Sequence, residues 1–214
     1  MVGLAGCFCS FRAKKIKDML KRLFDIIFSF LGLIIIFPLL IIVAILVKQS
    51  SKGPIFYRGE RVGKNGKIFR PYKFRTMVTG AEKIGSSTTG KNDPRVTKIG
   101  RFLRKYKIDE FPQLIDVLRG RMSLVGPRPE LEEHVECYNE EEKRILEVLP
   151  GMTDYASVEF VSLDEEVGEE DVDEMYIKKV RGRKNKLRLK YVNNQSFFKD
   201  LKILIKTFSA ILKK

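Results

Sequence analysis

The adjacent carboxylates Asp109 and Glu110 are the residues with the clearest potential for chemistry. They stand just before Pro112, and a proline is common at the start of a helix. The positive end of a helix keeps a nearby carboxylate ionised, and an ionised aspartate can attack phosphorus or hold a metal ion. The alternative is that the pair only caps the helix, and the local pattern by itself favours capping.

Basic residues surround this pair. Arg128 lies between two prolines, at a predicted helix start where backbone N–H groups and a guanidinium can bind phosphate. Lys73 and Arg75 in the segment PYKFRTM add positive charge. The bases that precede the pair most closely are Arg101, Arg104, Lys105 and Lys107. Carboxylates for a metal ion beside cations for phosphate are what phosphoryl transfer requires.

Other reactive residue types are scarce. The single histidine, His134, lies among glutamates, which predicts a solvated helix residue rather than a catalyst. Three cysteines without regular spacing do not resemble a disulfide framework and indicate a reducing compartment. No P-loop and no dinucleotide-binding glycine pattern is present, which disfavours ATP or NAD chemistry. Reactive chemistry must therefore rest mainly on carboxylates.

The net charge of the 214-residue chain is +14, which indicates an anionic partner. Nucleic acid, anionic lipid headgroups and phosphate-bearing substrates all fit that charge. A second acidic pattern, Asp171 and Asp173, matches the two-Asp arrangement with which some glycosyltransferases hold a metal ion. It lies inside a strongly acidic run, where chance explains it.

An uncharged segment of 22 residues, Ile26 to Val47, is long enough for a membrane helix. Pro38 near its middle should kink that helix. Basic residues flank it on both sides, including Lys21 and Arg22, and positive charge marks the cytoplasmic side. We therefore expect a helix that enters one leaflet, bends at Pro38 and returns. A straight span is the alternative.

Elements that position the acidic pair can be read from local patterns. Asn65-Gly66 between alternating runs predicts a small β element over Val62 to Lys73, and residues 79–95 read as a loop. Residues 196–214 form a basic amphipathic pattern, which can lie in the headgroup plane or pack on the core. Helical patterns are predicted over Arg101–Tyr106, Pro112–Leu118 and Pro129–Leu149.

Several blocks together resemble the small monotopic phosphoglycosyl transferases of the bacterial sugar transferase family, from about Lys21 to the C-terminus. The blocks are KRLFDIIFS, the Pro-broken apolar helix, GPIFYRGERVGKNGKIF, YKFRTM, NDPRVTKIGRFLR, DEFPQLIDVLRGRMSLVGPRPE, PGMT and SFFKDLKIL. Their number and order make the resemblance specific. It implies a UDP-sugar donor, undecaprenyl phosphate as acceptor, Mg²⁺ and release of UMP, in the first membrane step of glycoconjugate assembly.

The resemblance also implies roles for individual residues. Asp109 would form a covalent phospho-sugar intermediate, and Glu110 would assist metal binding or deprotonation of the acceptor phosphate, with both carboxylates near the Mg²⁺. The basic residues that match family positions are Arg104, Arg128, Lys73, and Lys21 with Arg22 at the membrane entry. Three departures stand out: Phe37 before Pro38, Asp154 after PGMT, and Arg188 at the position of a family aspartate, with Asp173 lying farther upstream.

These observations predict an α+β, mostly helical, monotopic protein of three segments. They are a basic N-terminal segment (1–22), a re-entrant membrane helix (23–48) and a catalytic domain (49–214) on the cytoplasmic face of a bacterial inner membrane. Its predicted partners are a UDP-sugar, undecaprenyl phosphate and membrane lipids, without nucleic acid. Exopolysaccharide, capsule, O-antigen and glycoprotein pathways all fit. The alternatives are a non-enzymatic membrane-anchored module that binds anionic lipid or nucleic acid, and a glycosyltransferase using Asp171 and Asp173.

Overall fold

The computed structural model describes residues 3–81, 84, 93–160 and 176–213, and it is mostly helical with small two-stranded sheets. The predicted α+β, mostly helical class is confirmed. The α-helices are α1 (Gly3–Ser50), α2 (Lys98–Lys105), α3 (Leu114–Leu118), α4 (Glu132–Glu136), α5 (Tyr155–Glu159), α8 (Gly182–Asn193) and α9 (Phe197–Leu212). Tighter or wider turns are η1 (Lys64–Gly66), η3 (Ile108–Gln113), η4 (Glu142–Glu147) and η5 (Tyr176–Arg181). The strands are β1 (Phe56–Tyr57), β2 (Arg61–Val62), β3 (Ile68–Phe69), β4 (Lys73–Phe74), β5 (Ser123–Val125) and β6 (Gly151–Thr153). Asp171 and Asp173 lie outside the described residues.

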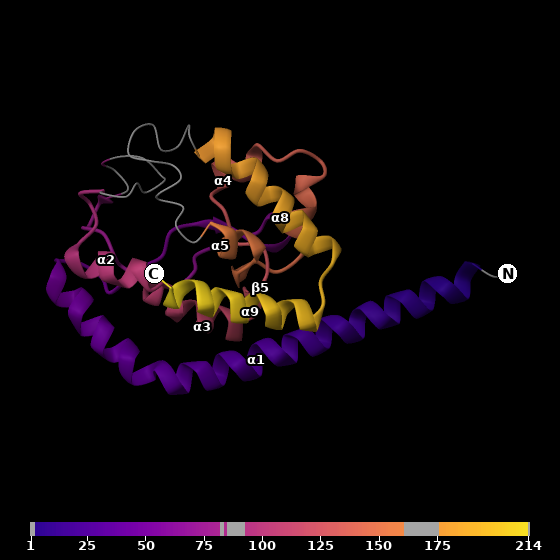
Figure 1. Cartoon of the computed structure of the whole chain (residues 1–214), viewed down its shortest axis with the longest axis horizontal. Coiled ribbons are helices and arrows are strands. Elements are labelled where there is room, and N and C mark those ends of the chain that lie inside the picture. Colours follow the sequence, from indigo (N-terminus) through magenta and orange to yellow (C-terminus); the bar gives the residue numbers. More distant parts are fainter. Residues whose placement is uncertain (1–2, 82–83, 85–92, 161–175, 214) are drawn as a thin grey trace.

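Helix α1 is long and apolar enough to cross a membrane. Within Lys15–Ser50, its most apolar window has a mean hydropathy of 3.3 and is mostly not buried inside the protein. The helix continues across Pro38 and across the predicted segment boundary at residue 22. Figure 1 shows α1 changing direction along its length and its N-terminal part projecting beyond the other elements. The re-entrant course through one leaflet stays a prediction.

The basic pair at the predicted membrane entry fastens α1 to the rest of the protein. Arg22 donates hydrogen bonds of 2.6 and 2.9 Å to the carbonyls of Val117 and Leu118 at the end of α3, where a cation complements the helix dipole. Lys21 forms a 2.7 Å ion pair with Asp200 of α9. In Figure 1, α3 and α9 accordingly lie beside α1. The pair thus sets the orientation of the apolar helix relative to the domain.

The predicted hairpin is present. β2 and β3 pair antiparallel, with Arg61 opposite Phe69. The turn between them needs left-handed backbone, which Asn65 (φ 57°) and Gly66 (φ 74°) supply. A second antiparallel pair joins β1 to β4, with Tyr57 opposite Lys73. The pairing fixes Lys73 on a short, rigid element.

The predicted helix over Pro129–Leu149 is wrong as a single element. The structure has two short pieces, α4 and η4. Asn139 lies between the two pieces: its side chain accepts a hydrogen bond from the Glu142 N–H at 2.9 Å, and the Glu142 carboxylate accepts from the Asn139 N–H at 3.1 Å. This reciprocal capping competes with a continuous helix. Arg128 therefore lies in an irregular turn, residues 126–130, and not at the predicted helix start, because α4 begins at Glu132.

The apolar core joins α1, α3, β5, α8 and α9. Its buried members are Phe24, Leu114, Val117, Met122, Leu124, Val125, Tyr191 and Ile203. Helix α9 buries Ile203 in this core but leaves Phe198, Ile205 and Phe208 strongly exposed. One side of α9 therefore packs on the domain, while another carries an uncovered apolar row of the kind that fits a headgroup layer.

Candidate active site

Asp109 and Glu110 lie in η3, a tight turn that runs directly into α3. Lys107, just before it, has left-handed backbone (φ 56°, ψ 19°), so the chain reverses sharply at the entrance to the turn. Both carboxylates are buried, with 1% of Asp109 and 7% of Glu110 exposed. Such burial of two neighbouring acids is costly without compensating positive charge.

Glu110 receives that compensation from two basic side chains. The guanidinium of Arg128 holds both carboxylate oxygens, through Nη1 to Oε2 at 2.8 Å and through Nη2 to Oε1. The ammonium of Lys73 lies 3.2 Å from Oε1. Burial alone would raise the pKa of Glu110, but the charges of Arg128 and Lys73 hold it far below its usual range. Glu110 is therefore ionised at neutral pH.

Asp109 is differently placed. Lys73 Nζ lies 2.9 Å from Asp109 Oδ2, close enough for an ion pair. The contact lacks hydrogen-bond geometry, and neither carboxylate oxygen of Asp109 has a hydrogen-bond partner among the described residues. A buried carboxylate oxygen without a hydrogen bond retains its capacity to accept a metal ion or to form a new bond. The acidic pair thus combines one fully bonded carboxylate with one that is held by charge alone.

The other predicted phosphate-binding residues divide into two groups. Arg104 of α2 donates a 2.9 Å hydrogen bond to Thr76 Oγ1, and its charge acts on the Asp109 carboxylate. Arg75 is buried and donates instead to the Ser51 carbonyl at 2.7 Å, at the C-terminal end of α1. The structure therefore brings Lys73, Arg104 and Arg128 to the acidic pair and places Arg75 at a helix end.

The acidic pair offers carboxylate ligands for a metal ion, but too few to complete its shell. No group of three or more His, Cys, Asp or Glu suited to a metal occurs in the described part of the chain. Mg²⁺ is commonly bound by one or two carboxylates, with water and substrate phosphate completing its shell. The unbonded oxygens of Asp109 beside Glu110 fit that pattern. The residues that would hold the ion are therefore Asp109 and Glu110.

A cavity of about 210 Å³ lies next to Lys73 and Arg128, which contact this pair, although neither Asp109 nor Glu110 lines it. Its walls include Lys73 and Arg128, and the other basic residues that line it are Arg61, Lys184 and Arg188. Tyr57 and His134 complete much of the wall. A small cavity walled by several cations suits a substrate that carries phosphate.

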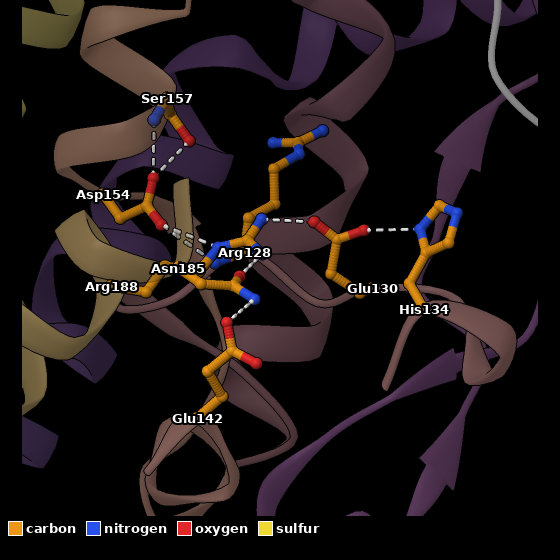
Figure 2. Close-up of polar contacts among 8 residues, drawn as sticks. All are labelled: Arg128, Glu130, His134, Glu142, Asp154, Ser157, Asn185 and Arg188. Carbon is orange, nitrogen blue, oxygen red and sulfur yellow. Dashed lines mark hydrogen bonds and ion pairs between the residues drawn. The ribbon is translucent and has the colours of Figure 1, made fainter. Parts of the chain in front are cut away.

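Several contacts around the cavity were not predicted from the sequence. Figure 2 shows Arg188 of α8 between Glu130 and Asp154, with His134 against Glu130. The prediction for His134 is wrong: the residue is 8% exposed, and its Nδ1 lies 3.1 Å from Glu130 Oε2. The glutamate that covers it is four residues earlier, a helical spacing that could have indicated the contact.

Comparisons with known proteins show which sequences the chain is similar to. A family model described as bacterial sugar transferase matches residues 16–214. The chain is 37% identical over 217 residues to the undecaprenyl-phosphate galactose phosphotransferase of Salmonella typhimurium, covering 94% of this chain and 42% of that protein. It is 38% identical over 200 residues to the UDP-glucose:undecaprenyl-phosphate glucose-1-phosphate transferase of Escherichia coli, covering 90% and 40%. It is 36% identical over 213 residues to the exopolysaccharide production protein ExoY of Sinorhizobium fredii, covering 92% and 88%. The chain thus spans less than half the length of the first two relatives.

Proposed function

The chain belongs to the bacterial sugar transferase family, and we propose that it transfers a sugar 1-phosphate from a UDP-sugar to undecaprenyl phosphate, releasing UMP. Family membership makes it a transferase of the phosphoglycosyl transferase type, which does not favour a non-enzymatic binding module. The names of the relatives carry galactose and glucose. Relatives of similar sequence identity are named for different sugars, so the sugar that this chain transfers is left open.

The observation that carries the proposal is the buried acidic pair beneath Lys73 and Arg128. Donor and acceptor are both anions, so direct attack of one on the other is opposed by charge. In the proposed first step, an Asp109 carboxylate oxygen attacks the β-phosphorus of the donor. The bond from that phosphorus to the oxygen bridging to UMP breaks, and UMP leaves with the electron pair. Arg128 and Lys73 offset the charge that develops on the phosphoryl oxygens.

The second step returns the enzyme to its starting state. A phosphate oxygen of undecaprenyl phosphate attacks the phosphorus of the Asp109 adduct, and the bond to the Asp109 oxygen breaks. The product is a polyprenyl-diphosphate-linked sugar. Mg²⁺ held by Asp109 and Glu110 would supply further charge neutralisation. The depressed pKa of Glu110 makes it a poor proton acceptor at neutral pH, so its proposed role is to hold cations in place.

The donor can reach Asp109 only if Lys73 leaves the Asp109 carboxylate. The residue is 1% exposed, and Lys73 lies over its carboxylate. We expect the donor diphosphate to draw the Lys73 ammonium away, because that ammonium then pairs with phosphate oxygens instead of two carboxylates. This exchange would uncover the nucleophile when the donor is bound and keep it shielded otherwise.

The experiment that tests the function is a screen of UDP-sugars with undecaprenyl phosphate and Mg²⁺ for UMP. Release of UMP together with a lipid-linked sugar phosphate is the expected result. Release of UDP would instead indicate an ordinary glycosyltransferase and would overturn the proposal. Without the lipid, each enzyme molecule should release about one molecule of UMP, because the covalent adduct then accumulates.

A further inference from the structure

Arg188 is a buried arginine that the proposed reaction does not use directly. It lies on α8, and 1% of it is exposed. Its Nη2 donates to Glu130 Oε1, and its Nη1 donates to Asn185 Oδ1 at 3.1 Å. Its Nε lies 3.7 Å from Asp154 Oδ2. An arginine fork is suited to joining two carboxylates in this way.

Asp154 links Arg188 to the backbone of Arg128. Its Oδ2 accepts the backbone N–H of Arg128 at 3.2 Å. Its Oδ1 accepts the N–H and the hydroxyl of Ser157 at 2.6 and 2.7 Å, which caps α5. Figure 2 shows Asp154 between Ser157 on one side and Arg128 with Arg188 on the other. Asp154, which is fully buried, therefore cannot shift without disturbing the Arg128 backbone.

Glu130 fixes the other end of the same turn. Its carbonyl accepts the Val62 N–H at 2.9 Å, which ties the turn to β2. Burial alone would raise the pKa of Glu130, but the charge of Arg188 and the hydrogen bond with His134 hold it well below its usual range. The carboxylate is thus ionised and held by Arg188. The Arg188 side chain consequently contacts both carboxylates, Asp154 and Glu130, that hold the turn around Arg128.

The turn itself has little freedom to adjust. Gly126 and Gly151 approach so closely that a Cβ on Gly151 would lie 2.1 Å from the Gly126 nitrogen. The Gly151 N–H donates to the Pro127 carbonyl at 2.9 Å, and Arg128 Nη1 donates to the Met152 carbonyl at 3.2 Å. Residues 126–130 and 151–154 therefore form one packed unit, and Arg188 clamps it against α8.

We infer that Arg188 is a positioning residue for the proposed reaction, which acts through Asp154 and Glu130 to aim the Arg128 guanidinium at Glu110. The inference rests on the proposed function for its effect on turnover, but the clamp itself can be measured separately. A misplaced Arg128 guanidinium would lower the rate of phosphoryl transfer even though Arg128 itself is retained.

The first measurement is hydrogen exchange of the full-length protein in lipid nanodiscs, followed in a peptide that contains residues 126–130. Arg188→Met should accelerate exchange in this peptide. Arg183→Met is the matched control, because Arg183 lies on the same helix in an exposed ion pair with Glu159. Unchanged exchange in a folded Arg188→Met protein would overturn the inference. If that variant does not fold, Arg188→Lys keeps a charge but lacks the fork, and its peptide should exchange at an intermediate rate.

The second measurement is UMP release in a double-mutant cycle. Arg188→Met should lower kcat by up to about 100-fold in the native background, and much less in an Arg128→Lys background, because the aimed fork is already gone. Arg188→Lys should restore part of kcat. Equal losses in both backgrounds would show a general structural role and overturn the inference. If the native protein releases no UMP, the proposed function fails, and the exchange measurement still decides whether Arg188 holds Arg128.

Discussion

The ammonium of Lys73 lies 2.9 Å from Asp109 Oδ2, and Asp109 has no hydrogen bond to either of its carboxylate oxygens among the described residues. The same ammonium lies 3.2 Å from Glu110 Oε1. A single cation thus bridges the two carboxylates. In the proposed reaction this cation passes to the donor diphosphate, so Lys73 acts both as a shield for Asp109 and as a ligand for phosphate.

Lys73→Met should therefore lower kcat/KM for the UDP-sugar strongly. A charge-assisted contact contributes about 1.5–3 kcal/mol, which corresponds to roughly one to two decades in rate. The matched control is Lys64→Met, because Lys64 is an exposed lysine in the turn of the neighbouring hairpin. Initial rates of UMP release measure both variants. Equal, small losses from the two substitutions would contradict the role given to Lys73.

The cavity predicts a pH dependence that can be traced to one lysine. Burial lowers the pKa of Lys184 from 10.5 to about 8. Its ammonium is charged below that pH and neutral above it, so a phosphate-bearing donor should bind less well as pH rises through about 8. We expect kcat/KM for the donor, which reports the free enzyme, to fall there. In Lys184→Met this fall in kcat/KM at alkaline pH, the alkaline limb of the profile, should be lost.

Lys186→Met is the control for that profile, because Lys186 lies exposed on the same helix. It should keep the alkaline limb of the native protein. An unchanged limb in Lys184→Met would assign the titration to another group and remove Lys184 from the donor site.

Topology at the membrane follows from α1. Its basic flanks and Pro38 predict that both ends lie on the cytoplasmic side. Single cysteines at Lys15 and Lys52, in a chain whose native cysteines are replaced by serine, should both be labelled from that side alone. Labelling from opposite sides would show a true span. Pro38→Ala should favour spanning, because it restores the backbone hydrogen bond that proline removes.

Local chemistry explains which parts of the fold could be predicted. The hairpin was predictable because Asn65 and Gly66 supply the left-handed backbone of its turn, and the C-terminal helix because Ser196 caps an amphipathic run. The break between α4 and η4 was missed because a side-chain cap at Asn139 competes with a regular apolar pattern.

The acidic pair and Arg128 stood out from the sequence because acids, bases and prolines are concentrated in one stretch. The contact between Arg188 and Glu130 could not be read from the sequence, since the two residues are 58 positions apart along the chain. Such contacts are created by packing of α8 against the 126–130 turn and leave no periodic signal. The burial of His134 was missed because it depends on elements that the local pattern does not contain, although its four-residue spacing from Glu130 is visible in the sequence.

The central claim is that Asp109 is the nucleophile, and intact-protein mass measures it most directly. The native protein, incubated with UDP-sugar and Mg²⁺ but no lipid, should gain the mass of one phospho-sugar. Asp109→Asn keeps the size of the side chain but removes its charge, so it should show no gain and no turnover while remaining folded and membrane-bound. If Asp109→Asn still formed the adduct or released substantial UMP, the nucleophile would be another group and the proposed mechanism would be wrong.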